Sequence, residues 1–145
     1  MRVSEAMSRD VQVAASDQTL QQAATKMRDL DVGALPVGEN DRLVGMITDR
    51  DIAIRAVADN KAPSTKVRDA MTRAVKFCYD DEDVDHVARN MGDQQVRRLP
   101  VVNRDKRLVG ILALGDLAAQ GAVRPAAQAL EGICQPGGRH SQAPG

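Results

Sequence analysis

Thr48 and Asp51 are the residues of this sequence whose types and spacing point most clearly to chemistry. They stand in the segment GMITDRD, residues 45–51, where an apolar stretch ends and a helix is predicted to begin. A hydroxyl and the free N–H groups of a helix start can hold a phosphate, and a carboxylate can accept hydrogen bonds from two sugar hydroxyls. The same pair also fits a helix cap, in which Thr48 caps the helix and the negative charge of Asp51 interacts favourably with the helix dipole. The two roles are compatible, because a cap can also contact a ligand.

Arg50 and Arg55 follow in the same predicted helix and could neutralise the charge of a phosphate. The segment recurs as GILALGD, residues 110–116, and again ends in an aspartate, Asp116. In this copy the hydroxyl is replaced by Ala113, which can neither cap the helix nor hold a phosphate. We therefore expect two unequal sites, with the one at Thr48 favoured, and Asp116 could serve only its own helix.

Cysteine and histidine do not suggest a second kind of site. Cys78 and Cys134 cannot form a CxxC pair, and His86 and His140 are not spaced as metal ligands with them. Cys78, Asp83 and His86 lie close in sequence, but no second histidine or carboxylate is placed to complete a catalytic relay. We expect neither a catalytic residue nor a bound metal.

The composition argues against several classes of protein. The chain has 145 residues, with 20 basic and 20 acidic side chains, one Phe, one Tyr and no Trp. Such a chain lacks the long-range field and the stacking rings typical of proteins that bind nucleic acids. Its longest apolar run, residues 108–115, is too short to span a bilayer. We expect a folded cytoplasmic protein with reduced thiols and with no nucleic-acid or membrane partner.

The chain repeats itself at a shift of 64 residues. The triplet LPV at 35–37 recurs at 99–101, and the tetrad RLVG at 42–45 recurs one residue later than that shift, at 107–110. A loop tolerates an insertion of one residue. Two copies indicate a pseudo-symmetric pair, since each must bury its apolar face against the other.

Each copy is predicted to follow the order β-α-β-β-α. For the first copy we predict strands at 11–14, 34–37 and 43–47 and helices at 20–30 and 49–58. For the second copy we predict strands at 98–102 and 107–112 and a helix at 114–120. The apolar stripes at 20–27 and 84–91 favour the core over an interface.

The predicted organisation is a chain of two repeats followed by a helix. We place the first repeat at 1–60, a linker at 61–65 and the second repeat at 66–123. A helix is predicted at 124–134, with Pro125 near its start, and a flexible tail at 135–145.

The paired LPV triplets, the paired RLVG tetrads and the aspartate at each helix start resemble a tandem pair of cystathionine β-synthase (CBS) domains, a Bateman module. The resemblance covers residues 3–123. It implies an α/β (α+β) fold of two pseudo-symmetric β-α-β-β-α repeats. Pairs of this kind bind adenosine-containing ligands such as AMP, ADP, ATP, NAD or S-adenosylmethionine in the clefts between the repeats, and they sense rather than catalyse.

The resemblance also implies ligand roles for individual residues. Its ribose-phosphate motif is matched by residues 45–51, so that Asp51 would bind the ribose and Thr48 the phosphate. The strand edge before each LPV triplet would face a cleft, and the segments at 7–13 and 71–77 would frame the base. The ligand-contacting residues implied in this way are Thr48, Arg50, Asp51, Arg55, Asp116, Arg97, Arg98, Val13, Ala34, Pro36, Phe77 and Tyr79.

Several of these residues have a structural alternative. Arg97 and Arg98 would face opposite sides of a strand, so only one would reach a ligand; either could instead be solvated or pair with the acidic run 80–85. Phe77 and Tyr79 share a face and could cover an adenine, although Phe77 suits the core equally well. Pro36 could simply fix the strand's backbone.

The function implied by the resemblance is that of a non-enzymatic sensor that acts as a homodimer on an unknown regulated protein. An adenosine-containing ligand would bind one arrangement of the chain better than another and so shift the population that a partner meets. The alternative is a CBS-fold dimerisation or interaction protein that has lost ligand binding, which Ala113 would suit.

Overall fold

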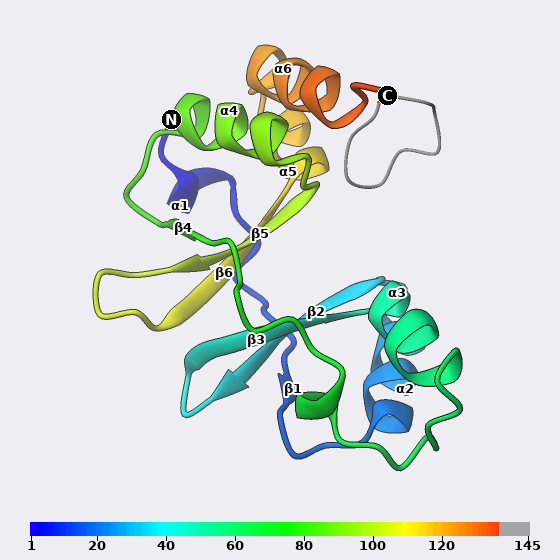
Figure 1. The fold of residues 1–145 in the computed structure, drawn as a ribbon. Coiled ribbons are helices and arrows are strands. Elements are labelled where there is room, and N and C mark those ends of the chain that lie inside the picture. Colours follow the sequence, from blue (N-terminus) through cyan, green and yellow to red (C-terminus); the bar gives the residue numbers. More distant parts are fainter. Residues whose placement is uncertain (137–145) are drawn as a thin grey trace. The chain divides into compact units, whose positions relative to one another are not determined.

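The chain divides into two units, each built on a three-stranded sheet (Figure 1). The computed structural model describes residues 1–136. Unit 2 contains Gln12–Val75 and Lys106–Leu108, and unit 1 contains Met1–Val11, Lys76–Asp105 and the chain from Val109 on. Strands and helices alternate in both units, which confirms the predicted α/β fold of two repeats.

The sheet of unit 2 has the strand order β1-β2-β3. Strand β1 (Ala14–Ala15) lies parallel to β2 (Ala34–Glu39), and β2 lies antiparallel to β3 (Arg42–Thr48). Helix α2 (Leu20–Leu30) joins β1 to β2 and begins at Thr19, whose Oγ1 accepts a hydrogen bond of 3.1 Å from the N–H of Gln22. The helix predicted at 20–30 is therefore confirmed, and it is capped by Thr19.

Unit 1 repeats this pattern with the strand order β4-β5-β6. Its strands are β4 (Cys78–Tyr79), β5 (Arg98–Val102) and β6 (Leu108–Ala113), and β4 lies parallel to β5. Its helices are α4 (Val84–Gln94), α5 (Leu114–Ala119) and α6 (Val123–Ile133). Helix α6 packs on both α4 and α5.

Each sequence copy contributes its first segment to the unit that holds the sheet of the other copy. Helix α1 (Val3–Ala6) belongs to unit 1, and the 3₁₀ helix η2 (Val67–Asp69) belongs to unit 2. We call residues 1–11 and 66–75 the lead-in segments. The units therefore do not coincide with the sequence repeats, whose boundaries at 1–60 and 66–123 stay a prediction.

Matching hydrogen bonds hold the two lead-in segments. The N–H of Val3 donates to the Glu82 carbonyl at 2.9 Å, and the N–H of Val67 donates to the Gln18 carbonyl at 2.8 Å. Further along, Ser8 forms a β-bridge with Ile111, and Thr72 forms one with Met46. These pairs are related by the shift seen in the sequence, so the duplication extends to the backbone contacts.

The glycine of each RLVG tetrad lets its lead-in segment approach the sheet. A Cβ atom added to Gly45 would lie 2.9 Å from the carbonyl oxygen of Thr72, and one added to Gly110 would lie 2.9 Å from that of Ser8. These carbonyl oxygens belong to the backbone, so they cannot move away from an added Cβ by a change of rotamer as a flexible side chain can. The motif therefore contains glycine because another backbone passes over it.

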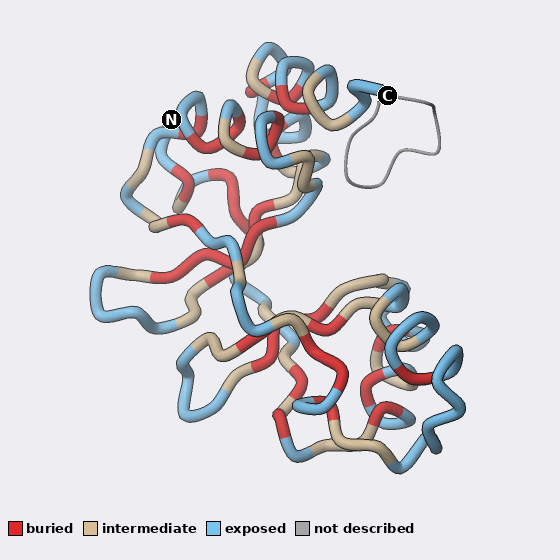
Figure 2. The backbone as a smooth tube through the Cα atoms, in the orientation of Figure 1, coloured by how far each residue is buried: buried red, intermediate tan, exposed pale blue. Residues whose placement is uncertain are grey.

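The apolar stripes of the first helix in each copy face the core. Leu20, Ala23 and Met27 of α2 are buried, as are Val87 and Met91 of α4. Figure 2 shows buried backbone on the inner side of these helices and along the strands. The stripes at 20–27 and 84–91 are therefore core, and the structure rules them out as an exposed interface.

Three elements differ from the prediction. The strand expected at 11–14 is reduced to β1 (Ala14–Ala15), because the chain passes from unit 1 to unit 2 after Val11. The helix expected at 49–58 is a short α3 (Asp49–Asp51) followed by a π-helix, η1 (Ile52–Val57). Helix α6 begins at Val123, before Pro125, because proline is tolerated in the first helical turn.

Helices α4 and α6 approach closely where two glycines meet. A Cβ added to Gly132 of α6 would lie 2.6 Å from the carbonyl oxygen of Gly92 in α4. The first copy has Arg28 at the position of Gly92, so this contact is specific to unit 1. The predicted tail, 135–145, lies outside the described residues apart from Gln135 and Pro136.

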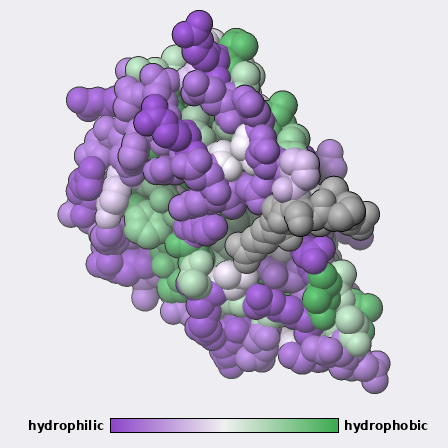
Figure 3. All heavy atoms as spheres, turned by 45° about the horizontal axis from the view of Figure 1, so that its top comes forward, coloured by the Kyte–Doolittle hydropathy of each residue, from purple (hydrophilic) through white to green (hydrophobic). Residues whose placement is uncertain are grey.

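The surface is largely polar on the face drawn in Figure 3, where apolar side chains form separate patches. The large apolar side chains that are exposed include Leu30, Ile54 and Val57 of unit 2 and Val123 and Leu130 of α6. Within residues 1–136, none of the helices has the length and apolar character that crossing a membrane requires.

Candidate functional site

Thr48 and Asp51 form a reciprocal cap where β3 turns into α3. The N–H of Asp51 donates to Thr48 Oγ1 at 3.0 Å, and the N–H of Thr48 donates to Asp51 Oδ2, also at 3.0 Å. The capping role considered in the sequence is thus present. Because Thr48 engages only Oδ2, the other carboxylate oxygen of Asp51 is available for a further partner.

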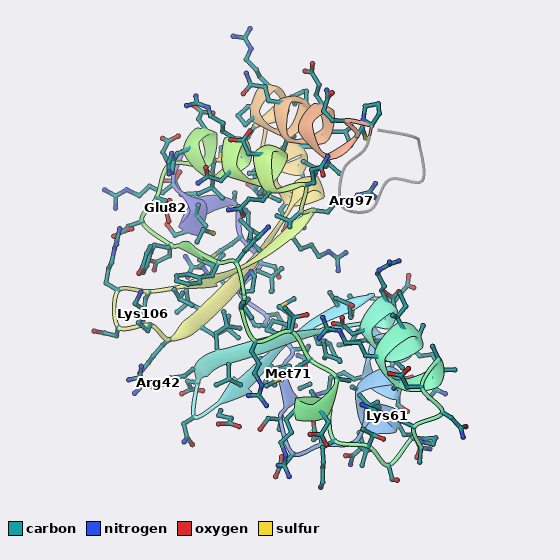
Figure 4. The ribbon with its side chains drawn as sticks, viewed as in Figure 1. Arg42, Lys61, Met71, Glu82, Arg97 and Lys106 are labelled. Atoms are coloured by element: carbon teal, nitrogen blue, oxygen red, sulfur yellow. The ribbon has the colours of Figure 1, made fainter. Side chains whose placement is uncertain are left out.

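That further partner is Arg55, in the last turn of the π-helix η1. Its Nε lies 3.7 Å from Asp51 Oδ1, and its Nη1 donates a hydrogen bond of 3.3 Å to the carbonyl of Met71. Met71 is labelled in Figure 4 and lies on the lead-in segment 66–75. The structure therefore brings Thr48, Asp51 and Arg55 together with a segment that was predicted to frame a base.

Arg50 is placed differently. Its backbone N–H donates to Asp49 Oδ1 at 2.8 Å, and its side chain is exposed. Asp49 in turn donates its own N–H to the Gly33 carbonyl at 2.9 Å, which fixes the start of α3 against β2. Of the two predicted arginines, only Arg55 contacts the capped carboxylate.

The corresponding region of unit 1 retains half of this arrangement. Asp116 Oδ2 accepts a hydrogen bond of 3.0 Å from the N–H of Ala113, but Ala113 has no side-chain oxygen that could accept the N–H of Asp116 in return. Gln120 stands at the position that matches Arg55. The two regions therefore differ in the side chains that cap and follow their helix starts.

Arg97 and Arg98 are exposed, and neither forms an ion pair within residues 1–136. The carbonyl of Arg97 accepts the N–H of Leu114 at 3.0 Å, which repeats the contact between Gly33 and Asp49. The acidic run 80–85 pairs with a different arginine, Arg104. Of the two structural alternatives, solvation therefore holds and the ion pair does not.

Phe77 and Tyr79 form a surface cluster with Arg104 and Asp81. The two rings meet edge to face with centroids 5.6 Å apart, and the Arg104 guanidinium lies 4.0 Å from the centroid of Tyr79. Arg104 also donates two hydrogen bonds to Asp81, at 2.7 and 2.8 Å, and these hold the pKa of that carboxyl below its usual range. Phe77 is 41% exposed, so the core role considered for it is wrong.

The remaining predicted contacts lie along the unit 2 sheet. Ala34 pairs with Thr48 at the end of β2, and Pro36 is buried opposite Met46. The carbonyl of Val13 accepts a hydrogen bond of 2.8 Å from Lys26 Nζ. Burial of Pro36 fits the backbone role considered for it, whereas Ala34 adjoins the capped turn.

Two contributors to these regions were not found in the sequence. The carbonyl of Met71 belongs to a backbone, so residue types carry no signal for it. Arg104 is separated from Asp81 by 23 positions, and a pairing across that distance depends on the sheet. The spacing of Asp51 and Arg55 by four residues was a usable signal for an ion pair.

Cys78 is buried in unit 1, and Cys134 is exposed at the end of α6. Burial, together with the charges of Glu82 and Asp80, raises the pKa of the Cys78 thiol to about 12. The described residues 1–136 contain no cluster of three His, Cys, Asp or Glu side chains able to hold a metal ion.

Thiol labelling should therefore separate the two cysteines. At pH 8 we expect the native protein to react with one equivalent of a thiol reagent at Cys134, because reaction requires an accessible thiolate. Cys78 should react only after unfolding. Cys134→Ser should leave the native protein unlabelled, and two equivalents in the native state would contradict the buried thiol.

Comparison with known proteins identifies both halves of the sequence. The family model described as CBS domain matches residues 3–57 and 67–121. A curated relative, the uncharacterized protein YlbB of Bacillus subtilis strain 168, is 40% identical over 119 residues, which cover 81% of this chain and 80% of that protein.

Solved structures of CBS domain proteins share this fold. The CBS domain pair of protein MJ0100, solved with 5-methylthioadenosine and S-adenosyl-L-methionine, matches with a TM-score of 0.73 and 32% identity, covering 86% of this chain and 98% of that chain. CBSX2 in complex with AMP also matches with a TM-score of 0.73, at 26% identity, covering 85% and 96%.

Proposed function

Because the chain belongs to the CBS domain family and its two domains form a CBS pair, we propose that it is a regulatory protein whose unit 2 binds an adenosine-containing ligand at Thr48 and Asp51. The observation that carries this proposal is that one carboxylate oxygen of Asp51 accepts no hydrogen bond from the cap. Oδ2 of Asp51 is held by the cap, while Oδ1 has, among residues 1–136, only the 3.7 Å contact with Arg55. A ribose diol needs such an acceptor, held in place by other groups.

Ligands of related pairs indicate the chemical class. The MJ0100 pair was solved with two adenosine compounds, of which one is a sulfonium and the other is a neutral thioether, and CBSX2 was solved with AMP. All three ligands contain an adenosyl group, so we propose that the site of unit 2 recognises this part of its ligand. Candidate ligands are AMP, ADP, ATP, NAD and S-adenosylmethionine.

The region around Asp116 in unit 1 favours a weaker site or none. Ala113 leaves one capping interaction unmade, and Gln120 supplies no charge. The proposal therefore assigns the regulatory ligand to unit 2 first. Loss of ligand binding in both units, which would leave an interaction protein, is the alternative that the following experiment distinguishes.

A matched pair of cap variants tests the proposal. Thr48→Ala and Thr19→Ala each remove a hydroxyl that accepts an N–H at a helix start, at 3.0 and 3.1 Å, so each should cost about 1 kcal/mol of stability. Only Thr48 lies at the proposed site. In a thermal-shift screen with the five ligands, wild type and Thr19→Ala should be stabilised by at least one of them, by about 2.7 kcal/mol at 100 times its Kd.

Thr48→Ala should lose most of that stabilisation. Equal ligand shifts in the two variants would place the site elsewhere, and no shift with any ligand, in protein freed of carried-over nucleotide, would support the interaction protein instead. Asp51→Asn complements the test, because asparagine keeps an acceptor for the Thr48 N–H while it removes the charge. Asp51→Ala is less informative, since it also breaks the cap.

Signalling through a homodimer is a further part of the proposal. The helix stripes first considered for the contact are buried, so the interface must use other side chains, for which Leu30, Ile54 and Val57 are exposed candidates. Static light scattering of the full chain with and without ligand measures the assembly. A monomer at all concentrations would remove the dimer from the proposal.

A further inference from the structure

Arg55 lies between two acceptors in unit 2 and forms a hydrogen bond with one of them, the Met71 carbonyl. Its Nε is 3.7 Å from Asp51 Oδ1, which is beyond hydrogen-bonding distance, and its Nη1 reaches the Met71 carbonyl at 3.3 Å. Its side chain is 51% exposed. A guanidinium has five N–H donors in a planar fork, so most of the donors of Arg55 remain for a third group.

The contact between Arg55 and Asp51 is of the kind that exchanges readily. Water reaches the Arg55 guanidinium, whose side chain is 51% exposed, and its Nε lies 3.7 Å from Oδ1, so this pair adds little to stability even though the Asp51 side chain is only 13% exposed. The carboxylate keeps its position without Arg55, because the N–H of Thr48 holds the other oxygen at 3.0 Å. Arg55 can therefore turn toward a new anion without disturbing the cap.

We propose that Arg55 determines ligand class at this site by favouring phosphorylated adenosine compounds over the uncharged nucleoside. The inference rests on the proposed function, in which Asp51 Oδ1 accepts the ribose hydroxyls. When the ribose of a neutral nucleoside binds Oδ1, the Arg55 guanidinium loses its contact with the carboxylate and gains no new anionic partner. A nucleotide brings a phosphate, which replaces the lost carboxylate contact with charge-assisted, bidentate hydrogen bonds.

The second copy of the sequence supplies the comparison for this residue. Gln120 matches Arg55, and Gly115 matches Arg50, so the Asp116 region has no cation at either position. The helix carrying Arg55 also differs, being a π-helix where α5 is an α-helix. Arg55→Gln thus installs in unit 2 the residue that unit 1 already has.

Calorimetric titration of the full chain with AMP and with adenosine tests the inference. For Arg55→Gln we expect AMP affinity to fall roughly 10- to 100-fold, the range for losing hydrogen bonds to a charged group. Adenosine affinity should stay unchanged or rise, because the Arg55 guanidinium no longer competes with the ribose hydroxyls for Asp51 Oδ1. Arg55→Lys, which keeps the charge without the fork, should fall between the wild type and Arg55→Gln for AMP.

The outcomes separate the inference from its premise. Equal losses for AMP and adenosine would show that Arg55 only positions Asp51, and unchanged AMP affinity would show that it contacts no phosphate; each result overturns the inference while leaving the site in place. Binding that survives in Thr48→Ala overturns the proposed function and this inference with it. Binding of neither compound to wild type overturns this inference alone, and the thermal-shift screen with all five ligands then decides the proposed function. Thermal unfolding without ligand verifies that each variant is folded.

Discussion

Gly132→Ala is expected to lower the free energy of unfolding by about 1–3 kcal/mol, the usual cost of forcing an extra methyl into a packed contact. The new Cβ would lie within 2.6–2.7 Å of three backbone atoms of Gly92. Neither helix can relieve this contact by changing a rotamer, so α6 must move away from α4. Chemical denaturation measures the loss directly.

Gly115→Ala is the control for that substitution. Gly115 is also helical, in α5, but a Cβ there would meet nothing within 4 Å. Alanine should therefore stabilise the protein by about 0.5–1 kcal/mol, because glycine is the poorer helix former. If both variants were stabilised alike, α6 would not lie against α4 as the structure has it.

Gly110→Ala is the second substitution with a large expected effect. Its Cβ would lie 2.5 Å from Met7 Sδ and 2.9 Å from the Ser8 carbonyl. The Met7 side chain can move, but Ser8 is fixed by its β-bridge to Ile111. We expect a loss of about 1–3 kcal/mol and faster hydrogen exchange at the amides of Ser8 and Ile111.

Gly38→Ala is the matched strand control. Gly38 lies in β2, and a Cβ there would make only ordinary contacts, 3.6 Å from the Arg42 carbonyl and 3.9 Å from Val13. Its stability should change little, and exchange at Ser8 should be as in wild type. Slow exchange at Ser8 in Gly110→Ala would contradict the close passage of residues 1–11 over β6.

Local signals predicted much of the fold. Helical spacing predicted α2 and its buried stripe, and the LPV triplets marked the strands β2 and β5. The exchange of lead-in segments could not be predicted in this way. Periodicity shows which face of a segment is apolar, but Val3 and Val67 would be equally buried against either sheet.

The candidate site was predicted where its residues are close in sequence. Thr48, Asp51 and Arg55 fall within eight positions, so capping rules and helical spacing relate them. The contact of Arg55 with Met71 spans 16 positions and depends on η2 packing in unit 2. The π-helix was also beyond prediction, because residues 52–57 have the composition of an ordinary α-helix.

The two units differ in how their residues are distributed along the chain, and this sets an order of folding during synthesis. Unit 2 is nearly continuous, from Gln12 to Val75, so the ribosome delivers almost all of it before the sheet of unit 1 exists. Unit 1 is interrupted by unit 2, and Val3, Ala6 and Met7 have no sheet to cover them until β6 has emerged. These three side chains are therefore made before unit 2, but they are buried only after the last strand of unit 1 has been made.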